Sequence, residues 1–489
     1  MEHGGELGHE HRARRDGRRG AATRARGDAD AERWGECETL QIDDNYTLTG
    51  GGLTLASAST IPVSLGKTAG VATPITITGG TTKTGDGTLR VSNANVIAAM
   101  ASVATVNAGA ILEMTSGITF DRSITLNNGG TVQGSGAATS NGKITIDALA
   151  TTVTLATVAG GDVFVVGNGA NDVTGGTAAT TINVSGPGSV RLGAASDFDG
   201  SWLVGSGARL ELSAAAALRD TAASGVTLAG GALSARLNTA TTFTGQTNLT
   251  LTASSSLLSD RSSAGAGLTH TFGTLAMGGH KLVVAPGALA TSGTATITWG
   301  NVTLSGSPKF AVNDAGAASG KLTTGSLFGG GVALTISKTG NGDLAITGGA
   351  TDLVAGSQVN VSGGVNLDLL FPALGAGAAL NVTAAQHPLG AAGLAMAYGS
   401  LNLFADGDGT TAAQTFVLAN GTTISGGVVV IDAARRIGSN TTKTFEIPTL
   451  TLGADAAAGI GGANSYGLRV SGAAGRSTRR PAPSPAPVR

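Results

Sequence analysis

The chain has 489 residues, of which 79 are glycine, 12% are charged and 3% are aromatic, and its formal net charge is −1. Glycine is present at about twice its usual share of roughly 7%, and charged residues at about half of their usual 25%. Low charge excludes a charge-driven disordered protein, few prolines and no regular glycine period exclude collagen, and a net charge near zero argues against nucleic acid as a partner. The composition predicts a fold that buries small side chains in many thin, repeated layers.

Residues 1–38 differ from the rest of the chain because they are rich in Arg, Gly, Asp and Glu and almost lack Leu, Ile and Val. They predict a disordered charged arm or a mis-called start, and they contain no apolar stretch of a secretory signal. The single cysteine, Cys37, lies in this arm, so no disulfide framework is expected. His3, His9 and His11 also lie here, but no strand or helix pattern would hold them around a metal ion.

Residues 39–472 repeat one pattern, in which an apolar residue alternates with Thr or Asn between turns rich in Gly, Asn, Ser and Asp. Examples are Leu53-Thr54-Leu55, Ile144-Thr145-Ile146 and Leu450-Thr451-Leu452. Period-two alternation with β-branched residues predicts strands with one apolar face. These strands are too short and too numerous for a sandwich. They predict an all-β solenoid of coils of roughly 20–25 residues, each packed on its neighbours.

A more specific phrase occurs in residues 82–92, 183–192 and 337–347, where Gly-x-Gly is followed by an apolar-x-apolar strand. It predicts a tight turn at a coil corner, because glycine accepts positive φ, and a strand whose apolar pair enters the core. Two of the three phrases have a lysine, Lys83 or Lys338, at their second position, where the third has Val184. We expect these lysines to cover an exposed coil edge and discourage edge pairing. The structural repeat residues are Gly85, Gly87, Leu89, Val91, Gly186, Gly188, Val190, Leu192, Gly340, Gly342, Leu344 and Ile346.

A second strand follows each phrase, within residues 105–114, 204–212 and 359–369. With the phrases themselves, these segments resemble the autotransporter-associated β-strand repeat. The resemblance implies a right-handed parallel β-helix of the pectin-lyase-like type, a passenger that is secreted or held at the cell surface or outer membrane. It also implies an outer-membrane β-barrel translocator as a partner, which this chain lacks. The chain is therefore interpreted as a passenger fragment, with residues 473–489 as a disordered Pro/Arg-rich tail.

Two carboxylate pairs could carry chemistry, Asp197-Phe198-Asp199 and Asp406-Gly407-Asp408. Each pair would lie on one strand face or in one turn, but a solvated turn explains either pair as well. The segment from Gly167 to Asp172 is similar to one calcium-binding nonapeptide repeat, although that mechanism needs consecutive copies. We therefore expect no catalytic, cofactor-binding or metal site.

The isolated histidines His270, His280 and His387 are interpreted as solvated or hydrogen-bonded side chains. Trp202 and Trp299 are interpreted as buried side chains at coil corners, with stacking on sugars as the alternative.

The first hypothesis is a non-catalytic adhesin-like rod whose Thr, Asn and Ser face gives weak multivalent adhesion. Surface glycans or proteins of a host or neighbouring cell are its expected partners. The alternative is a polysaccharide-active lyase or glycosidase, which needs carboxylate, Arg, Lys or His side chains converging in a groove on one sheet. A third possibility is a truncated or mistranslated gene product without a function of its own.

Overall fold

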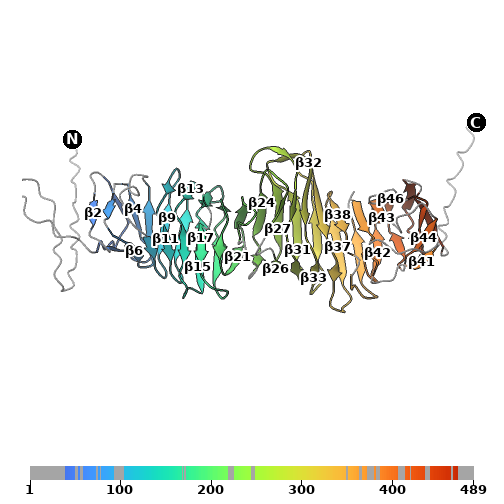
Figure 1. The fold of residues 1–489 in the computed structure, drawn as a ribbon, viewed down its shortest axis with the longest axis horizontal. Helices are drawn as coiled ribbons and strands as arrows, with labels where there is room; N and C mark the ends of the chain where they lie inside the picture. Colours follow the sequence, from blue (N-terminus) through green and yellow to red (C-terminus); the bar gives the residue numbers. More distant parts are fainter. Residues whose placement is uncertain are drawn as a thin grey trace, which may run out of the picture.

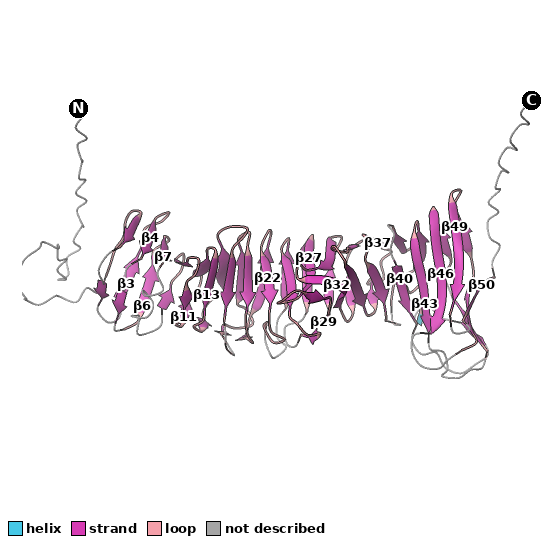
Figure 2. Ribbon diagram, turned by 90° about the horizontal axis from the view of Figure 1, so that it is seen from above, coloured by secondary structure: helices cyan, strands magenta, loops and turns pink. Residues whose placement is uncertain are grey.

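The computed structural model describes residues 39–471 with short gaps: 50–52, 56–58, 73–74, 78, 93–103, 168, 170–171, 219–224, 244–247, 349–350, 363–365, 372–378, 382–385, 406–412, 419, 436–440 and 464–465. The described residues contain strands but no α-helix. Consecutive coils stack along one axis into a rod, with the first and last described strands at opposite ends (Figures 1 and 2). This confirms the predicted all-β parallel β-helix. The arm 1–38 and the tail 473–489 lie outside the described residues.

The coil has three faces, because the chain visits three sheets in turn before it returns to the first. Every strand-to-strand ladder is parallel, for example Ile124–Leu126 beside Ile144–Ile146. Parallel neighbours within one sheet require a crossover connection, which the other two sides of the coil supply.

Face 1 is built from 13 strands, followed by four more that take over the same position in the coil. Its strands are β1 (Tyr46–Leu48), β4 (Thr68–Val71), β7 (Thr88–Val91), β9 (Ile111–Met114), β12 (Thr131–Gly134), β15 (Thr152–Thr157), β18 (Thr181–Ser185), β21 (Ser201–Gly205), β23 (Val226–Ala229), β26 (Leu249–Ala253), β30 (Leu275–Met277), β33 (Val302–Leu304), β36 (Leu327–Phe328), β41 (Ala379–Asn381), β44 (Gln414–Val417), β47 (Lys443–Ile447) and β50 (Gly467–Val470).

Face 2 begins with a two-stranded sheet and continues as a 14-stranded sheet. Its strands are β2 (Leu53–Leu55), β5 (Ile75–Ile77), β10 (Thr119–Phe120), β13 (Ala137–Ser140), β16 (Val163–Val166), β19 (Ser189–Leu192), β22 (Arg209–Leu212), β24 (Ala232–Arg236), β27 (Ser255–Asp260), β31 (Lys281–Pro286), β34 (Lys309–Val312), β37 (Thr335–Thr339), β39 (Gln358–Val361), β42 (Gly393–Met396), β45 (Thr422–Ile424) and β48 (Leu450–Leu452).

Face 3 is a seven-stranded sheet followed by a ten-stranded sheet. Its strands are β3 (Ser59–Pro62), β6 (Thr81–Thr84), β8 (Ala104–Val106), β11 (Ile124–Leu126), β14 (Ile144–Ile146), β17 (Val173–Gly175), β20 (Asp197–Phe198), β25 (Thr241–Thr242), β28 (Gly265–Ala266), β29 (Thr269–Thr271), β32 (Ala290–Thr298), β35 (Ala318–Thr324), β38 (Asp343–Ile346), β40 (Asn366–Leu370), β43 (Gly399–Ala405), β46 (Gly427–Arg435) and β49 (Ala456–Gly462).

The coil length varies along the rod. Register partners are 20 residues apart at Thr181↔Ser201 and 36 apart at Ala379↔Thr415. The predicted length of roughly 20–25 residues therefore describes the first half better than the second. Strands on face 3 also lengthen, and β46 spans nine residues.

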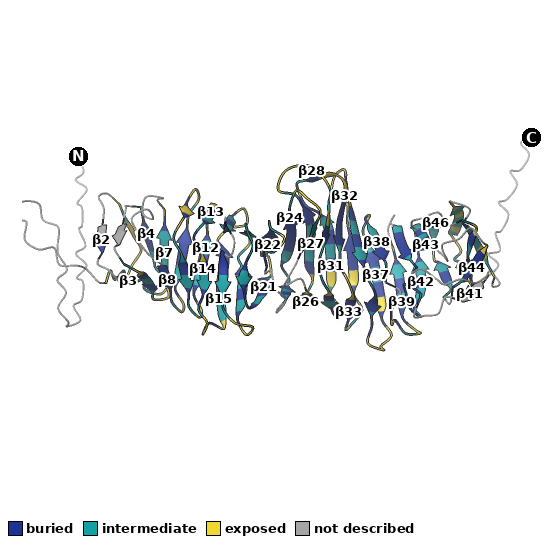
Figure 3. Cartoon of the chain, in the orientation of Figure 1, coloured by how far each residue is buried: buried dark blue, intermediate teal, exposed yellow. Residues whose placement is uncertain are grey.

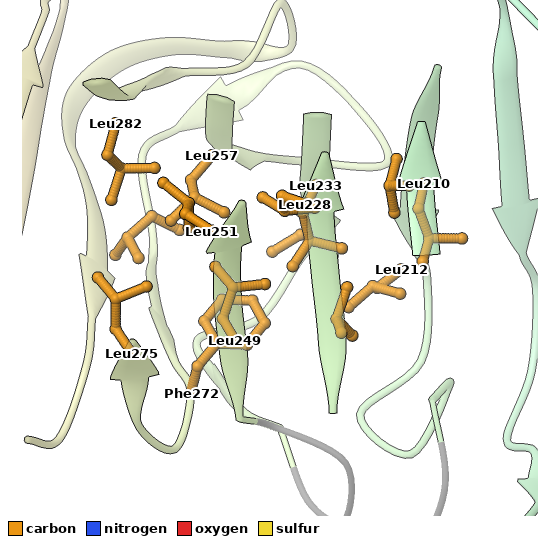
Figure 4. Close-up of a cluster of buried hydrophobic side chains, with 14 of the residues drawn as sticks. Leu210, Leu212, Leu228, Leu233, Leu249, Leu251, Leu257, Phe272, Leu275 and Leu282 are labelled. Atoms are coloured by element: carbon orange, nitrogen blue, oxygen red, sulfur yellow. The ribbon is translucent and has the colours of Figure 1, made fainter. Parts of the chain in front are cut away.

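The interior is filled by rows of equivalent apolar side chains, one from each coil. Figure 4 shows such leucines from neighbouring coils side by side, all of them buried: Leu210, Leu212, Leu228, Leu233, Leu249, Leu251, Leu257, Leu275 and Leu282. Each buried leucine contributes about 1.5–3 kcal/mol to the stability of the fold, because its apolar surface is removed from water. The parallel register places apolar side chains of successive coils beside one another, so the core is one continuous column.

Aromatic side chains extend this column at one corner. The ring centroids of Phe243 and Phe272 lie 4.6 Å apart, and those of Phe272 and Trp299 lie 4.8 Å apart. These spacings match the roughly 4.8 Å between neighbouring strands of a sheet, so the rings stack coil upon coil. Trp202 is fully buried and contacts the ring of Phe198 edge-on at 5.6 Å.

Each of the three Gly-x-Gly phrases lies at a different corner of the coil. They connect β6 to β7, β18 to β19 and β37 to β38, which are the corners from face 3 to face 1, from face 1 to face 2 and from face 2 to face 3. The first glycine of each phrase has positive φ, between 71° and 84°, and the apolar pair that follows is buried each time. The phrase therefore specifies a corner, not a particular face.

The expectation that Lys83 and Lys338 cover an exposed edge is wrong, because both side chains are buried. On face 3, Lys83 is the register partner of the buried Ile61 in one neighbouring coil and of the buried Val106 in the other. Its ammonium turns to the corner and donates to the carbonyl oxygens of Thr84 (2.5 Å) and Gly85 (2.8 Å).

Lys338 makes the same contacts with Thr339 (3.0 Å) and Gly340 (3.2 Å). The tight turn directs carbonyl oxygens inward, and a buried acceptor without a donor is costly. The lysine is therefore an internal clamp on the corner, and the buried Val184 shows that the position itself is interior.

Adding one methyl group at a corner glycine tests how closely the coils pack. The added Cβ of Gly186→Ala would collide with the carbonyl of Thr157 in the preceding coil, whereas at Gly207, also at positive φ, it would meet open space. Backbone strain of about 1–2 kcal/mol is common to both variants, and overpacking adds about 1–3 kcal/mol to the first alone. We expect Gly186→Ala to lower the urea midpoint clearly more than Gly207→Ala. Equal midpoints would contradict this view of the corner.

The buried lysines predict a stability that rises with pH. Burial lowers the pKa of Lys83 and of Lys338 to about 8, below the value of roughly 10.4 in an unfolded chain. Between these values the unfolded state binds more protons, so the free energy of unfolding increases with pH. The urea midpoint should rise from pH 7 to pH 9.5, and the rise should shrink in a Lys83→Met/Lys338→Met variant. The exposed Lys309 supplies the control, since Lys309→Met should keep the full rise.

Candidate functional site: the outer faces of the rod

The outward side chains of face 3 begin as a row of threonines. Six consecutive strands, β3 to β17, place a threonine at the same register position, half-buried each time: Thr60, Thr82, Thr105, Thr125, Thr145 and Thr174. Amide side chains repeat in the same way, and Asn127 Nδ2 donates to Asn107 Oδ1 at 2.6 Å. These rows form a flat polar ladder on this part of face 3. Figure 3 shows that exposed residues gather at corners and loops, such as those beside β28.

Face 2 carries a charged ladder that the sequence analysis missed. The carboxylate of Glu211 points outward from β22 but is buried, because Arg191 and Arg236 from the neighbouring strands cover it. Arg191 Nε lies 2.8 Å from Glu211 Oε2, and Arg236 Nε lies 3.9 Å away. Arg236 Nη1 also lies 3.5 Å from Asp260 Oδ2 on β27. These charges neutralise one another, so they stabilise the stacked coils and leave no free acid or base at Glu211.

A second charged cluster lies on the later part of face 3. Lys321 Nζ of β35 lies 2.7 Å from Asp368 Oδ2 of β40, and Asn402 Nδ2 of β43 donates to Asp368 Oδ1 at 2.8 Å. Asp343 of β38 lies opposite Lys321 in register. Burial raises the pKa of Asp343, the charge of Asp368 raises it further, and Lys321 and Asn366 oppose the rise. Burial and a second carboxylate thus raise the pKa of Asp343, while Asp368 is ion-paired with the ammonium group of Lys321.

The predicted carboxylate pairs do not form such a cluster in the part of the chain that the structure describes. Asp197 and Asp199 flank the buried Phe198 at β20, and one oxygen of Asp197 is buried without a hydrogen-bond partner. Asp406-Gly407-Asp408 lies outside the described residues. Across the described ranges, no group of three or more His, Cys, Asp or Glu side chains is placed to hold a metal ion.

The segment with similarity to a calcium-binding repeat closes its own loop. Asp172 Oδ2 accepts a hydrogen bond from the backbone N–H of Gly169 at 2.6 Å, and Gly167 has a φ of 86°. The carboxylate of Asp172 therefore accepts a hydrogen bond from the backbone of its own loop.

The three histidines have different surroundings. His270 is buried, and its Nε2 lies 3.2 Å from the carbonyl oxygen of Asp260; burial lowers its pKa. His387 Nδ1 accepts a hydrogen bond from the N–H of Leu389 at 3.0 Å, and burial lowers its pKa to about 4. His280 is partly exposed. The first two are neutral core side chains at pH 7, as hydrogen-bonded histidines were expected to be.

Trp202 and Trp299 are both buried in the interior. This confirms the interpretation as core residues and excludes stacking on a sugar at the surface. The sequence contained a signal for this burial, because both tryptophans stand at apolar positions of segments in which apolar and polar residues alternate. The sequence signal for the charged ladders was weaker. Arg191 and Glu211 are 20 residues apart, so their pairing can be predicted only when the coil length is known.

Comparison of the chain with family models, with curated proteins and with solved structures finds no match. Among the residues that the structure describes, no helix is long and apolar enough to span a membrane.

Proposed function

We propose that the chain is a non-catalytic β-helical passenger, secreted or held at the cell surface, that presents its outer faces for weak, multivalent adhesion. The observation that carries this proposal is the pairing of outward side chains with their own neighbours. Threonines form continuous rows, and Glu211 and Asp260 are neutralised by arginines. The threonine rows offer many equivalent hydrogen-bonding groups, and the carboxylates of Glu211 and Asp260 are engaged by arginines. Repetition then adds avidity, by about 10²–10⁴ when many weak contacts act together.

Export and the surface location rest on the resemblance of the Lys-Thr-Gly-x-Gly phrases to the autotransporter-associated repeat. Lys83 and Lys338 strengthen the physical case for that phrase, because they have a structural role as corner clamps. The expected partners are glycans or proteins on the surface of a host or neighbouring cell.

Density-dependent binding tests the adhesive function. Beads that carry the full chain at high or low density are incubated with epithelial cells and with mucin-coated and polyuronate-coated plates. We expect retention at high density to exceed retention at tenfold lower density by much more than tenfold, because adhesion through weak contacts is cooperative. Beads with the same density of a globular protein of similar charge are the control. Retention no greater than the control on every surface would overturn the proposal.

A polysaccharide-active enzyme is the second candidate, and the cluster of Lys321, Asp343 and Asp368 favours it. Those residue types are the ones that glycoside cleavage requires, and all three lie on face 3. If this candidate is right, the chain releases new reducing or unsaturated ends from a panel of neutral and acidic polysaccharides. Asp343→Asn should then abolish release, whereas Asp455→Asn, at an exposed turn, should leave it unchanged. No release by the unaltered chain would eliminate this candidate.

A further inference from the structure

A polar hollow of about 400 Å³ opens on face 1 across its first three strands, β1, β4 and β7. Such a volume lies within the range of about 300–1,000 Å³ that small-molecule sites occupy. The side chains and backbone that line it include Asn45, Thr47, Thr68, Gly70, Arg90 and Ser92. Arg90 and Ser92 belong to the Gly-x-Gly phrase of residues 82–92, but the motif did not mark either of them as a binding residue.

A glycine lies in the middle of the lining, and its backbone is buried. Thr47, Gly70 and Arg90 follow one another in register on three consecutive coils. Ala69 and Val71 on either side of Gly70 point into the core. A Cβ at Gly70 would come within 3.0 Å of Thr47 Oγ1 and 3.3 Å of Thr47 Cγ2, so a larger side chain at this position would displace Thr47 and crowd the hollow.

Arg90 is held at the edge of this hollow by a buried carboxylate. Its Nε lies 2.9 Å from Glu113 Oε1, and its Nη2 donates to Glu113 Oε2 at 3.3 Å. Glu113 is itself fixed, since Gln133 Nε2 donates to its Oε2 at 3.1 Å. The side chain of Glu113 is 3% exposed and that of Arg90 is 44% exposed. The guanidinium therefore has a defined position and still reaches solvent.

The free side of this guanidinium is suited to a second carboxylate. Arginine has five N–H donors in a planar fork, and Glu113 takes one from Nε and one from Nη2. Three N–H donors remain, and one on Nη1 and one on Nη2 form the end edge of the fork. That edge binds a carboxylate through two parallel hydrogen bonds.

The other groups of the hollow suit hydroxyls. Asn45 Oδ1 is fixed by the N–H of Thr68 at 2.8 Å, which leaves its amide nitrogen as a donor. Ser92 Oγ donates to the carbonyl of Val71 at 3.1 Å and keeps its lone pairs as acceptors. The hydroxyls of Thr47 and Thr68 add further donors and acceptors. A ligand that fits this lining bears several hydroxyl groups and one carboxylate.

We propose that this hollow binds a uronate unit of an acidic polysaccharide, with its carboxylate on Arg90 and its ring hydroxyls on Asn45, Thr47 and Ser92. This inference rests on the proposed adhesive function and gives it a ligand class. Glu113 balances the charge of Arg90, so a single hollow binds weakly, and many rods on one surface supply the avidity.

Titration of the full chain with trigalacturonate, followed by NMR of the ligand or by calorimetry, tests the inference. The unaltered chain should bind it saturably, and the fully methyl-esterified trisaccharide should bind at least tenfold more weakly, because it lacks the charge that Arg90 recognises. Arg90→Met should weaken binding of trigalacturonate at least tenfold, because it removes the guanidinium. Gly70→Val should do the same while leaving Arg90 in place, because its side chain occupies the hollow.

Arg191→Met is the matched control, since it removes an Arg–Glu pair between neighbouring coils on face 2 and leaves the hollow intact. It should bind trigalacturonate as the unaltered chain does, and the urea midpoints of all variants show whether they fold. The inference is overturned if the unaltered chain does not bind trigalacturonate, if the ester binds equally well, or if folded Arg90→Met retains full affinity.

The bead assay separates this inference from the broader proposal. If beads adhere but Arg90→Met beads adhere equally to polyuronate, adhesion stands and the hollow is not the site. If the soluble chain binds trigalacturonate through Arg90 but beads do not adhere, the hollow stands and the adhesive function fails.

Discussion

The parallel backbone ladder between successive coils is the interaction on which the rest of this structure depends. It fixes the spacing of coils at about 4.8 Å and places each residue directly over its register partner. Since side chains alternate between the two faces of a strand, a slip of one residue would exchange core and surface along the whole coil. The apolar rows of the interior and the polar rows outside are therefore two consequences of one register.

A narrow interior explains both the composition and its exceptions. Small and branched apolar residues fill most rows, and the few large rings stack on one another at a corner, as Phe272 does on Trp299. At the corners the chain turns within very few residues, which requires unusual backbone conformations. Glycines such as Gly186 accept positive φ close to the backbone of the preceding coil, and Lys83 and Lys338 satisfy the carbonyl groups that the turn directs inward.

The same register organises the surface. It brings threonines together on face 3, and it lets Arg191 and Arg236 cover Glu211 from both sides on face 2. Some of the outward charges are paired in such ladders. The hollow on β1, β4 and β7 differs, because there Arg90, fixed by Glu113, borders a polar hollow. A rod with a repetitive surface can thus still contain one local site.

The sequence by itself determined the strands, the solenoid and the inward position of Trp202 and Trp299, because alternation of apolar and polar residues is a local property of the chain. It also located the corners, because positive φ requires glycine. Tertiary structure alone decided which strands share a face, since that depends on coil lengths that vary from 20 to 36 residues. The burial of Lys83, the separation of the three Gly-x-Gly phrases onto three corners, and the meeting of Arg90 with Glu113, 23 residues apart, all follow from those lengths. Local periodicity carries no information on coil length, which depends on how each corner and loop packs on the coil before it.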